Sequence, residues 1–388
     1  MHARYPELSR RRVTPRTGGD PAGQTWQPGA GRVSAAVRVL VGLAIALIPA
    51  AGAAQAPTKP IVDTVSIKDL VGASGLDRGG EVIVSKGDNI LVKSGGHRQA
   101  RLWRWASVTK QVIATLVLQE VAAGHIDLEK PVAAYLPQFK SANAGLVTVR
   151  QLLRHQSGLP NPDDTAATPE SVPAYDAPDY KGSRDPLTGY CAGPVKRASG
   201  GNWEYNNCDY VVAGALLEAV TGKSWQTLVR DRIAMPLGLK TLGTFPTRKR
   251  TVAGTVDGKA EPGYDLTAFG ASAGLYGSAD DLRKFDRALM TGKLLSESAR
   301  AQLWDGQPQL GSIALGQWVF AVPLKGCAKP VRIVERRGAI GGVEVRNFIL
   351  PDVDVVAIVF VNRAGFDFGE VWQGKGFSYD LLRAAACS

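Results

Sequence analysis

Residues that bind metals are scarce in this chain of 388 residues, which has only four cysteines and four histidines. No Cys-x-x-Cys pair occurs, and the histidines beyond the N-terminal segment, at positions 97, 125 and 155, are widely separated. Protein metal sites draw most of their soft and nitrogen ligands from closely spaced cysteines and histidines. The sequence therefore argues against a metal site, and we expect no cofactor.

The chain also lacks a long hydrophobic run. Val39–Ile48 is apolar, but this stretch is too short to span a bilayer as a helix. Arg38 precedes it and the small residues Pro49–Ala54 follow, which gives the charged start, short apolar centre and Ala-x-Ala end of a secretory signal. We expect residues 1–53 to be a leader and signal peptide cut near Ala53. The mature protein would then be periplasmic or secreted, without a stable membrane anchor.

A concentrated basic patch is missing as well, although the net charge is +11. The first 53 residues hold seven arginines and two acidic residues, so the rest of the chain has a net charge of +6. The densest basic run that remains, Arg248–Arg250, has no aromatic residues interleaved with it, unlike a nucleic-acid-binding surface. With 45% hydrophobic residues, the chain has the composition of a globular enzyme, in one bilobed domain or two. Its expected partner is a small-molecule or peptide substrate with an acyl group, not a nucleic acid.

The most informative motif is a Ser-x-x-Lys sequence that begins at Ser107 and opens an apolar stretch with helical spacing. A serine hydroxyl needs a neighbouring base before it can attack a carbonyl at neutral pH. Positions three apart lie on one face of a helix, so Ser107 Oγ and Lys110 Nζ can meet. The dipole of the first helical turn favours the negative charge that develops during attack. This layout is typical of an acyl-transfer enzyme.

A second motif, Tyr205-Asn206-Asn207, lies further along the chain. In an extended segment residues i and i+2 point the same way, so we expect Tyr205 and Asn207 to face the nucleophile together. Tyrosine ordinarily titrates near ~10, so Tyr205 can act as a base only if nearby cations stabilise its phenolate. Two roles for Lys110 stay open: it takes the serine proton itself, or it holds Tyr205 as a phenolate.

These segments resemble a known family. Ala106–Lys110 is similar to the first motif of the class C β-lactamase and D-Ala-D-Ala carboxypeptidase superfamily, and Tyr205–Asn207 is similar to its second motif. The stretches Gln151–Pro160 and Ala273–Leu282 fit the same family, and the resemblance covers roughly residues 62–385. It implies the fold and the acyl-enzyme chemistry of serine β-lactamase-like proteins, which include D,D-carboxypeptidases and family VIII esterases.

The resemblance also implies roles for individual residues. Ser107 would form the acyl-enzyme, with Lys110 and Tyr205 as the other catalytic groups. Asn207 would orient Lys110 and the substrate amide, and the backbone N–H groups of Ser107 and Ala339 would form the oxyanion hole. The expected function is that of an exported serine hydrolase acting on a D-amino-acid peptide, an ester or, weakly, a β-lactam.

The third family motif is where the chain departs from the pattern. The family has Lys-Thr-Gly or His-x-Gly on a strand, whereas this chain has Arg336-Arg337-Gly338-Ala339. Arg336 keeps the positive charge and offers a planar fork that suits a substrate carboxylate, but it cannot give up a proton. Gly338 leaves room for the substrate to approach the backbone. Arg337 either fills the cleft, which would hinder β-lactam hydrolysis, or points away because strand neighbours alternate faces. The sequence leaves both orientations open.

The pattern along the chain predicts an α/β (α+β) fold. Strands are expected at Glu81–Val84, Ile90–Val92, Trp318–Pro323, Val343–Ile349 and Val353–Val361, and helices at Val149–His155, Tyr210–Thr221 and Phe377–Ala385. We therefore expect an antiparallel sheet built from both chain ends and flanked by helices, over residues 60–130 plus 261–388. A mainly helical lobe would be inserted at residues 131–260 and would carry active-site loops.

All four cysteines lie beyond the expected signal, in the part of the chain that would reach an oxidising compartment. Four cysteines allow three pairings. We favour Cys191–Cys208, which would hold the loop leading into Tyr205, together with Cys327–Cys387, which would tie a late strand to the last helix.

Two alternatives compete with this interpretation. Gly270–Gly274 matches the Gly-x-Ser-x-Gly motif of α/β-hydrolases, but no histidine follows His155, so Ser272 lacks a base in the chain order that this fold requires. We reject it. A non-catalytic binding protein on the β-lactamase-like fold stays as the alternative function. We expect His155 itself to be structural, as its counterpart in the family is.

Overall fold

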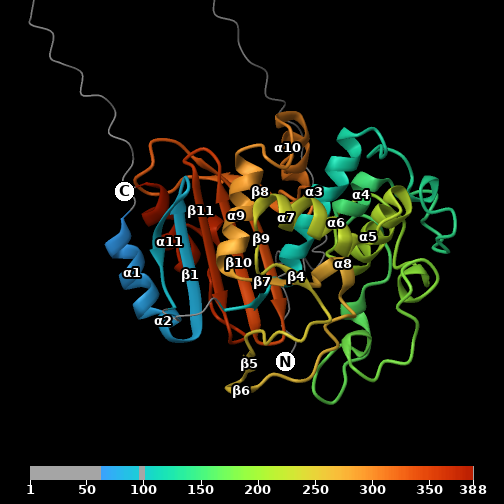
Figure 1. The fold of residues 1–388 in the computed structure, drawn as a ribbon, viewed down its shortest axis with the longest axis horizontal. Helices are drawn as coiled ribbons and strands as arrows, with labels where there is room; N and C mark the ends of the chain where they lie inside the picture. Colours follow the sequence, from blue (N-terminus) through green and yellow to red (C-terminus); the bar gives the residue numbers. More distant parts are fainter. Residues whose placement is uncertain (1–62, 96–100, 388) are drawn as a thin grey trace, which may run out of the picture. The chain divides into compact units, whose positions relative to one another are not determined.

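The computed structural model describes residues 63–95 and 101–387, and its centre is an antiparallel sheet of six strands in the order β2-β1-β11-β10-β9-β8 (Figure 1). The strands are β1 (Gly80–Lys86), β2 (Asn89–Lys93), β8 (Trp318–Val322), β9 (Val331–Ile340), β10 (Val343–Leu350) and β11 (Val355–Val361). The first strand pairs with the last, with Gly80 opposite Val361 and Lys86 opposite Val355. The prediction of a sheet built from both chain ends is therefore confirmed.

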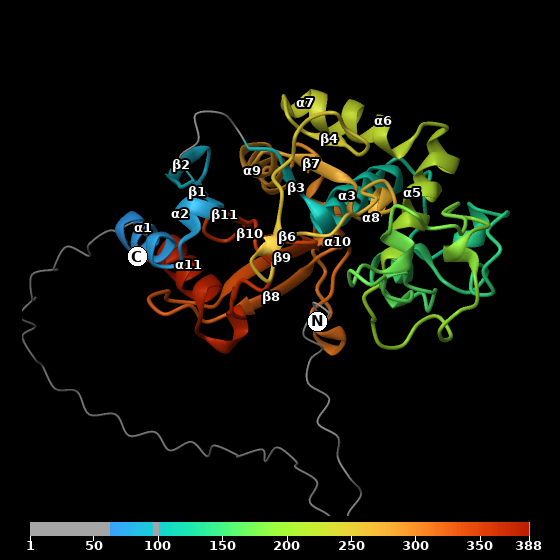
Figure 2. The same cartoon turned by 90° about the horizontal axis from the view of Figure 1, so that it is seen from below.

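Helices cover both faces of this sheet (Figure 2). Helices α1 (Thr64–Ala73) and α11 (Phe377–Ala386) pack on one face, where the odd-numbered residues of β11 point. Helix α9 (Ala279–Met290) packs on the other face against the even-numbered ones. Because both faces are covered, every residue of β11 is buried, and its sequence is a continuous apolar run rather than an alternating one.

The remaining helices lie along the chain between β2 and β8, except for the short α2 (Leu76–Gly79), which leads into β1. They are α3 (Thr109–Ala122), α4 (Val149–Leu153), α5 (Asn207–Thr221), α6 (Trp225–Val229), α7 (Met235–Leu237), α8 (Gly270–Ala273) and α10 (Glu297–Leu303). Short strands complete this part: β3 (Trp103–Arg104), β4 (Gly243–Thr244), β5 (Thr255–Val256), β6 (Lys259–Ala260) and β7 (Leu275–Gly277). The domain boundaries at residues 130 and 260 stay a prediction.

Helix α3 is the central helix of this part, because α5, α6, α8 and α10 all pack against it. Nearly all of its residues are buried, the polar ones Lys110 and Gln111 included, so this helix lies in the interior of the protein. Its N-terminal end, which carries the Ser-x-x-Lys motif, is also in contact with β9 through the turn that precedes the helix. The fold thus brings the first motif against the third one.

The predicted signal peptide lies outside the described residues. Among those that are described, no helix has the length and apolar character needed to cross a membrane.

Candidate active site

Ser107 lies in a tight turn immediately before α3, not in the helix as the sequence predicts. Residues Ala106–Val108 form a 3₁₀ turn, and α3 begins at Thr109. Ala106 has a φ of +46°, a left-handed conformation that is strained for alanine and that is typical of functional sites. Lys110 follows in the first turn of α3, and its Nζ lies 3.2 Å from Ser107 Oγ. The two side chains meet as expected, and both are buried.

The second motif meets this pair from the start of α5. Asn206 is extended and caps the helix, since its side chain accepts a hydrogen bond from Cys208 N. Asn207 is already the first helical residue, so the motif is only partly extended. Because the residue between them is extended, Tyr205 and Asn207 nevertheless point to the same place. The Tyr205 hydroxyl lies 2.6 Å from Ser107 Oγ and 2.7 Å from Lys110 Nζ.

Lys110 is held by four oxygen atoms. Besides Ser107 and Tyr205, its Nζ donates to Asn207 Oδ1 at 2.7 Å and to the backbone carbonyl of Ser272 at 3.1 Å. Ser272 lies in α8, and its own hydroxyl donates to Phe269 O. The serine that sequence analysis rejected as a nucleophile therefore contributes a carbonyl oxygen to the site. No side-chain pattern could have identified that contact.

Burial sets the protonation of the two groups that could act as base. It lowers the pKa of Lys110 well below its usual value; the charge of Arg336 lowers it further, and Asp163 and Asp209 oppose the shift. Burial also raises the pKa of Tyr205, against the opposing effects of Arg336 and of the hydrogen bond with Ser107. Both directions favour an uncharged amine beside an uncharged phenol.

This protonation fits the geometry. A neutral amine has two N–H groups and one lone pair, and two carbonyl oxygens, of Asn207 and Ser272, lie within bonding distance of Lys110 Nζ. With Lys110 neutral, its lone pair would accept the Tyr205 hydroxyl 2.7 Å away, and the Tyr205 oxygen would accept the Ser107 hydroxyl at 2.6 Å. Every donor and acceptor around Lys110 is satisfied in this arrangement.

Arg336 approaches the same atoms from β9. It is almost fully buried, with 1% of its surface exposed. Its Nε donates to the carbonyl of Ser107 at 2.7 Å, and its Nη2 donates to the Tyr205 hydroxyl at 3.1 Å. Its Nη1 has no hydrogen-bond partner within the described part of the chain. Two of the three nitrogen atoms of this guanidinium, which we expected to suit a substrate carboxylate, thus bind atoms of the protein itself.

Arg337 points to the opposite face of the sheet from Arg336. Its guanidinium donates to Glu335 at 2.6 Å and to Glu370 at 2.8 Å. Arg346, its neighbour on β10, donates to the same Glu335 carboxylate. Strand alternation thus places Arg337 in an ion-pair network away from Lys110, and the bulk of this side chain gives no reason to exclude a β-lactam from the cleft.

Gly338 and Asn207 complete the surroundings of the nucleophile. Gly338 lies against the turn at Ser107, and the next residue, Ala339, is partly exposed. The oxyanion hole formed by Ser107 and Ala339 stays a prediction. On the other side, Asn207 Nδ2 donates to Asp163 Oδ1 at 2.9 Å. Asp163 cannot be predicted from the sequence, because only the tertiary fold brings its loop to Asn207.

Both favoured disulfide bonds are present, Cys191–Cys208 and Cys327–Cys387. Cys208 directly follows Asn207 in α5, so the first bond ties the long loop before Tyr205 to the helix that carries the second motif. The second bond joins the segment between β8 and β9 to the end of α11.

The chain is similar to several known proteins. A family profile described as Beta-lactamase matches residues 69–374. Esterase EstB of Burkholderia gladioli is 30% identical over 251 residues, which cover 55% of this chain and 64% of the esterase. Penicillin-binding protein 4 of Amycolatopsis lactamdurans is 32% identical over 215 residues, which cover 52% of this chain and 50% of that protein. The chain thus spans between a half and two thirds of the length of these relatives.

Among solved structures, a D-stereospecific amidohydrolase from Streptomyces superposes with a TM-score of 0.67 at 24% identity. The match covers 84% of this chain and 99% of the amidohydrolase, and it confirms the predicted fold class.

Proposed function

The chain belongs to the beta-lactamase family, and from that premise we propose that it is an exported serine hydrolase that forms an acyl-enzyme at Ser107. The observation that carries the proposal is the contact of Ser107 Oγ with both Lys110 Nζ and the Tyr205 hydroxyl. A nucleophile, a base and a group that can relay the proton between them are what acyl transfer needs. The substrates would be amides or esters.

In the proposed reaction Ser107 Oγ attacks the substrate carbonyl carbon, and the carbonyl electron pair moves to its oxygen. The Ser107 proton passes to the Tyr205 oxygen while the Tyr205 proton passes to the neutral amine of Lys110. Backbone N–H groups of Ser107 and Ala339 would stabilise the oxyanion. When the tetrahedral intermediate collapses, the bond to the leaving amine or alkoxide breaks, and the proton returns from Lys110 through Tyr205 to that group. Water then attacks the acyl carbon and loses a proton through Tyr205 to Lys110; when the bond to Ser107 Oγ breaks, that proton returns to the serine oxygen and the acid product leaves.

Arg336 would act on this relay rather than as a base, because a guanidinium does not lose its proton in proteins. Its Nη2 lies against the Tyr205 oxygen, where it favours any negative charge that develops during proton transfer. Among the residues that the structure describes, none bonds to Nη1 of Arg336, which would be the nitrogen that meets a substrate carboxylate.

The relatives narrow the substrate class to small molecules or peptides with an acyl group, since they are named as an esterase, a penicillin-binding protein and a D-stereospecific amidohydrolase. We propose turnover of a short-chain ester or a D-amino-acid peptide, and weak turnover of β-lactams. The ground for the last point is Arg336, which replaces the lysine or histidine of the family motif. A non-catalytic binding protein on this fold is the alternative.

Labelling with a fluorophosphonate probe tests the proposal. Such a probe reacts only with an activated serine, so the wild-type chain should be labelled and Ser107→Ala should not. Ser298→Ala, which removes an exposed hydroxyl in α10, is the matched control and should be labelled like the wild type. Mass spectrometry after incubation with a penicillin, a D-Ala-D-Ala peptide or a short-chain ester would then identify the acyl group on Ser107. An unlabelled wild-type chain that binds these compounds without reacting would favour the binding protein.

A further inference from the structure

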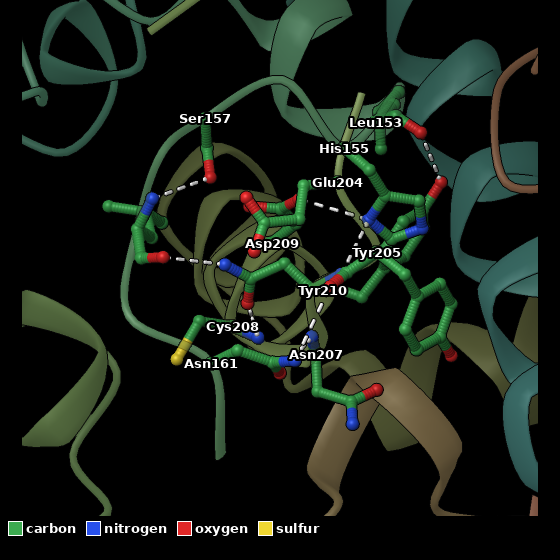
Figure 3. A network of polar contacts seen from close by, with 12 residues as sticks. Leu153, His155, Ser157, Asn161, Glu204, Tyr205, Asn207, Cys208, Asp209 and Tyr210 are labelled. Atoms are coloured by element: carbon green, nitrogen blue, oxygen red, sulfur yellow. Dashed lines mark hydrogen bonds and ion pairs between the residues drawn. The ribbon is translucent and has the colours of Figure 1, made fainter. Parts of the chain in front are cut away.

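His155, for which we expected a structural role, lies next to Tyr205 (Figure 3). It contacts three consecutive residues, numbered 204 to 206. Its carbonyl accepts a hydrogen bond from Glu204 N at 2.8 Å. Its ring packs on the Tyr205 ring with 4.8 Å between centroids and an interplanar angle of 48°. Its Nδ1 lies 3.4 Å from the backbone N–H of Asn206. A single residue thus contacts the segment that carries the phenol at three points.

The other side of the His155 ring is anchored to α5. Nδ1 lies 2.9 Å from Asp209 Oδ2, and neither side chain has any exposed surface. Tyr210 packs on the ring as well, with 5.4 Å between centroids, and its hydroxyl donates to the carbonyl of Leu153 at the end of α4. The imidazole therefore fills the junction where α4 ends and α5 begins.

Two polar groups face Nδ1 of His155: Asp209 Oδ2 at 2.9 Å and, further away, the backbone N–H of Asn206 at 3.4 Å. Burial lowers the pKa of His155 well below its usual value and raises the pKa of Asp209 well above its usual value, in agreement with an uncharged pair. Neither side chain of this pair is exposed, and an uncharged pair costs less to bury there than an unpaired ion would.

We propose that His155 is a positioning residue for Tyr205, whose phenol oxygen it keeps between Ser107 Oγ and Lys110 Nζ. The inference rests on the proposed function. The relay has contacts of 2.6 Å and 2.7 Å, so a displacement of the phenol by about 1 Å would interrupt it, and misplacement of that size can cost about 100-fold in rate. Lys110 Nζ and the Arg336 guanidinium lie 4.7 Å and 5.5 Å from the centroid of the Tyr205 ring, and His155 packs its own uncharged ring against the same phenol.

His155→Asn is the most direct test. Residue 155 has a φ of +60°, which asparagine tolerates better than most residues, and its short amide can bond Asp209 while the ring is removed. We expect kcat to fall about 10- to 100-fold with little change in KM. The matched control is His125→Asn. His125 is bonded through Nδ1 to Glu120 at 2.7 Å, but it lies after the far end of α3 with most of its side chain exposed, and its replacement should leave kcat unchanged.

Replacing a histidine with a purely structural role would also lower activity, because the fold would loosen. The same substitution must therefore also be measured in an enzyme that already lacks the relay. In a Tyr205→Phe enzyme the relay is already lost, and adding His155→Asn should then change the residual kcat less than 2-fold. Independent losses that multiply in the double variant would overturn the proposal. If His155→Asn does not fold, His155→Phe keeps a ring against Tyr205 but loses Nδ1; we expect a 5- to 10-fold loss of kcat that again vanishes with Tyr205→Phe.

A crystal structure of the His155→Asn protein separates this inference from the proposed function. A phenol oxygen more than 1 Å from its wild-type position, measured against Ser107 Oγ and Lys110 Nζ, supports the positioning role even if no substrate is turned over. An unmoved phenol rules that role out even if the enzyme is active. Failure of Ser107 to react with any probe in the wild-type chain would instead count against the proposed function alone.

Discussion

Gly338 lies so close to the nucleophile turn that a β-carbon on it would stand 2.9 Å from Ser107 N and 2.8 Å from Trp105 O. Both are backbone atoms and cannot rotate away, so Gly338→Ala must push β9 and the Ser107 turn apart. We expect kcat/KM to fall about 100-fold or more, the cost of losing one oxyanion-hole donor. Overpacking should also lower the free energy of unfolding by about 1–3 kcal/mol. Steady-state kinetics and urea unfolding measure the two effects.

Gly145→Ala is the matched control for this substitution, because a β-carbon there meets nothing within 4 Å and the backbone does not need glycine. It should leave kcat/KM and the urea midpoint unchanged. Wild-type activity in Gly338→Ala would mean that the turn does not need its close approach to β9.

The pH dependence follows from Lys110 and Tyr205. The base must be uncharged, and burial lowers the pKa of Lys110, so kcat/KM should rise with pH as Lys110 loses its proton, at a pH well below the usual value for lysine. The pKa of Tyr205 is raised, so this phenol keeps its proton and the alkaline decline should begin only above about 10. Lys110→Arg cannot provide an uncharged base and should lose activity by about 1,000-fold or more. An acid limb that Lys110→Arg leaves unchanged would exclude Lys110 as its source.

Stability should depend on pH through the same lysine. Lys110 has a lower pKa in the folded chain than its usual value of 10.5, so the unfolded chain binds more protons between these two values. The free energy of unfolding must therefore rise with pH across that interval. Lys110→Met removes the titrating group, so its curve should be flatter there, and urea titrations from neutral to alkaline pH would compare the two. If the free energy of unfolding changed with pH equally in the wild type and in Lys110→Met, Lys110 would have the same pKa in the folded and the unfolded chain.

Much of the candidate site can be predicted from the sequence because its geometry is local. Lys110 follows Ser107 by three residues at the start of α3, and this spacing places the two side chains together. Asn206 is extended, so Tyr205 and Asn207 point in the same direction. The contacts that could not be predicted are those made through the backbone or across the tertiary fold. The carbonyl of Ser272 and the carboxylate of Asp163 belong to this class.

The fold was predictable for similar reasons. Strands with unbroken apolar runs, such as β11, stand out in the sequence. Most of β9 does not, because it carries Glu335 and Arg337 where an alternating pattern would have apolar residues. Those charges are tolerated because Arg346 and Glu370 pair with them, and such pairing appears only when β10 and the segment before α11 are in place.

Arg336 and Arg337 should give opposite results when each is replaced by glutamine. Arg336→Gln removes the charge beside the Tyr205 oxygen and should lower kcat about 100-fold, while Arg337→Gln should leave kcat within about 3-fold of the wild type. Arg337→Gln leaves Glu335 buried with Arg346 as its remaining cation, so unfolding should become easier by about 2–3 kcal/mol. A large loss of kcat in Arg337→Gln would mean that this side chain reaches the substrate.

Removing each disulfide bond in turn should affect stability and activity differently. They close loops of 17 and 60 residues, so chain entropy predicts that losing Cys191–Cys208 costs about 3 kcal/mol and losing Cys327–Cys387 about 4 kcal/mol. The double serine variant at 327 and 387 should therefore have the lower unfolding midpoint but normal kcat, because that bond is remote from the motifs. The variant at 191 and 208 should be the more stable of the two and yet lose about 10-fold in kcat, since Cys208 adjoins Asn207 and fixes the start of α5. Equal kcat values, measured at a temperature where both variants are folded, would mean that α5 holds Tyr205 and Asn207 in place without its covalent tie.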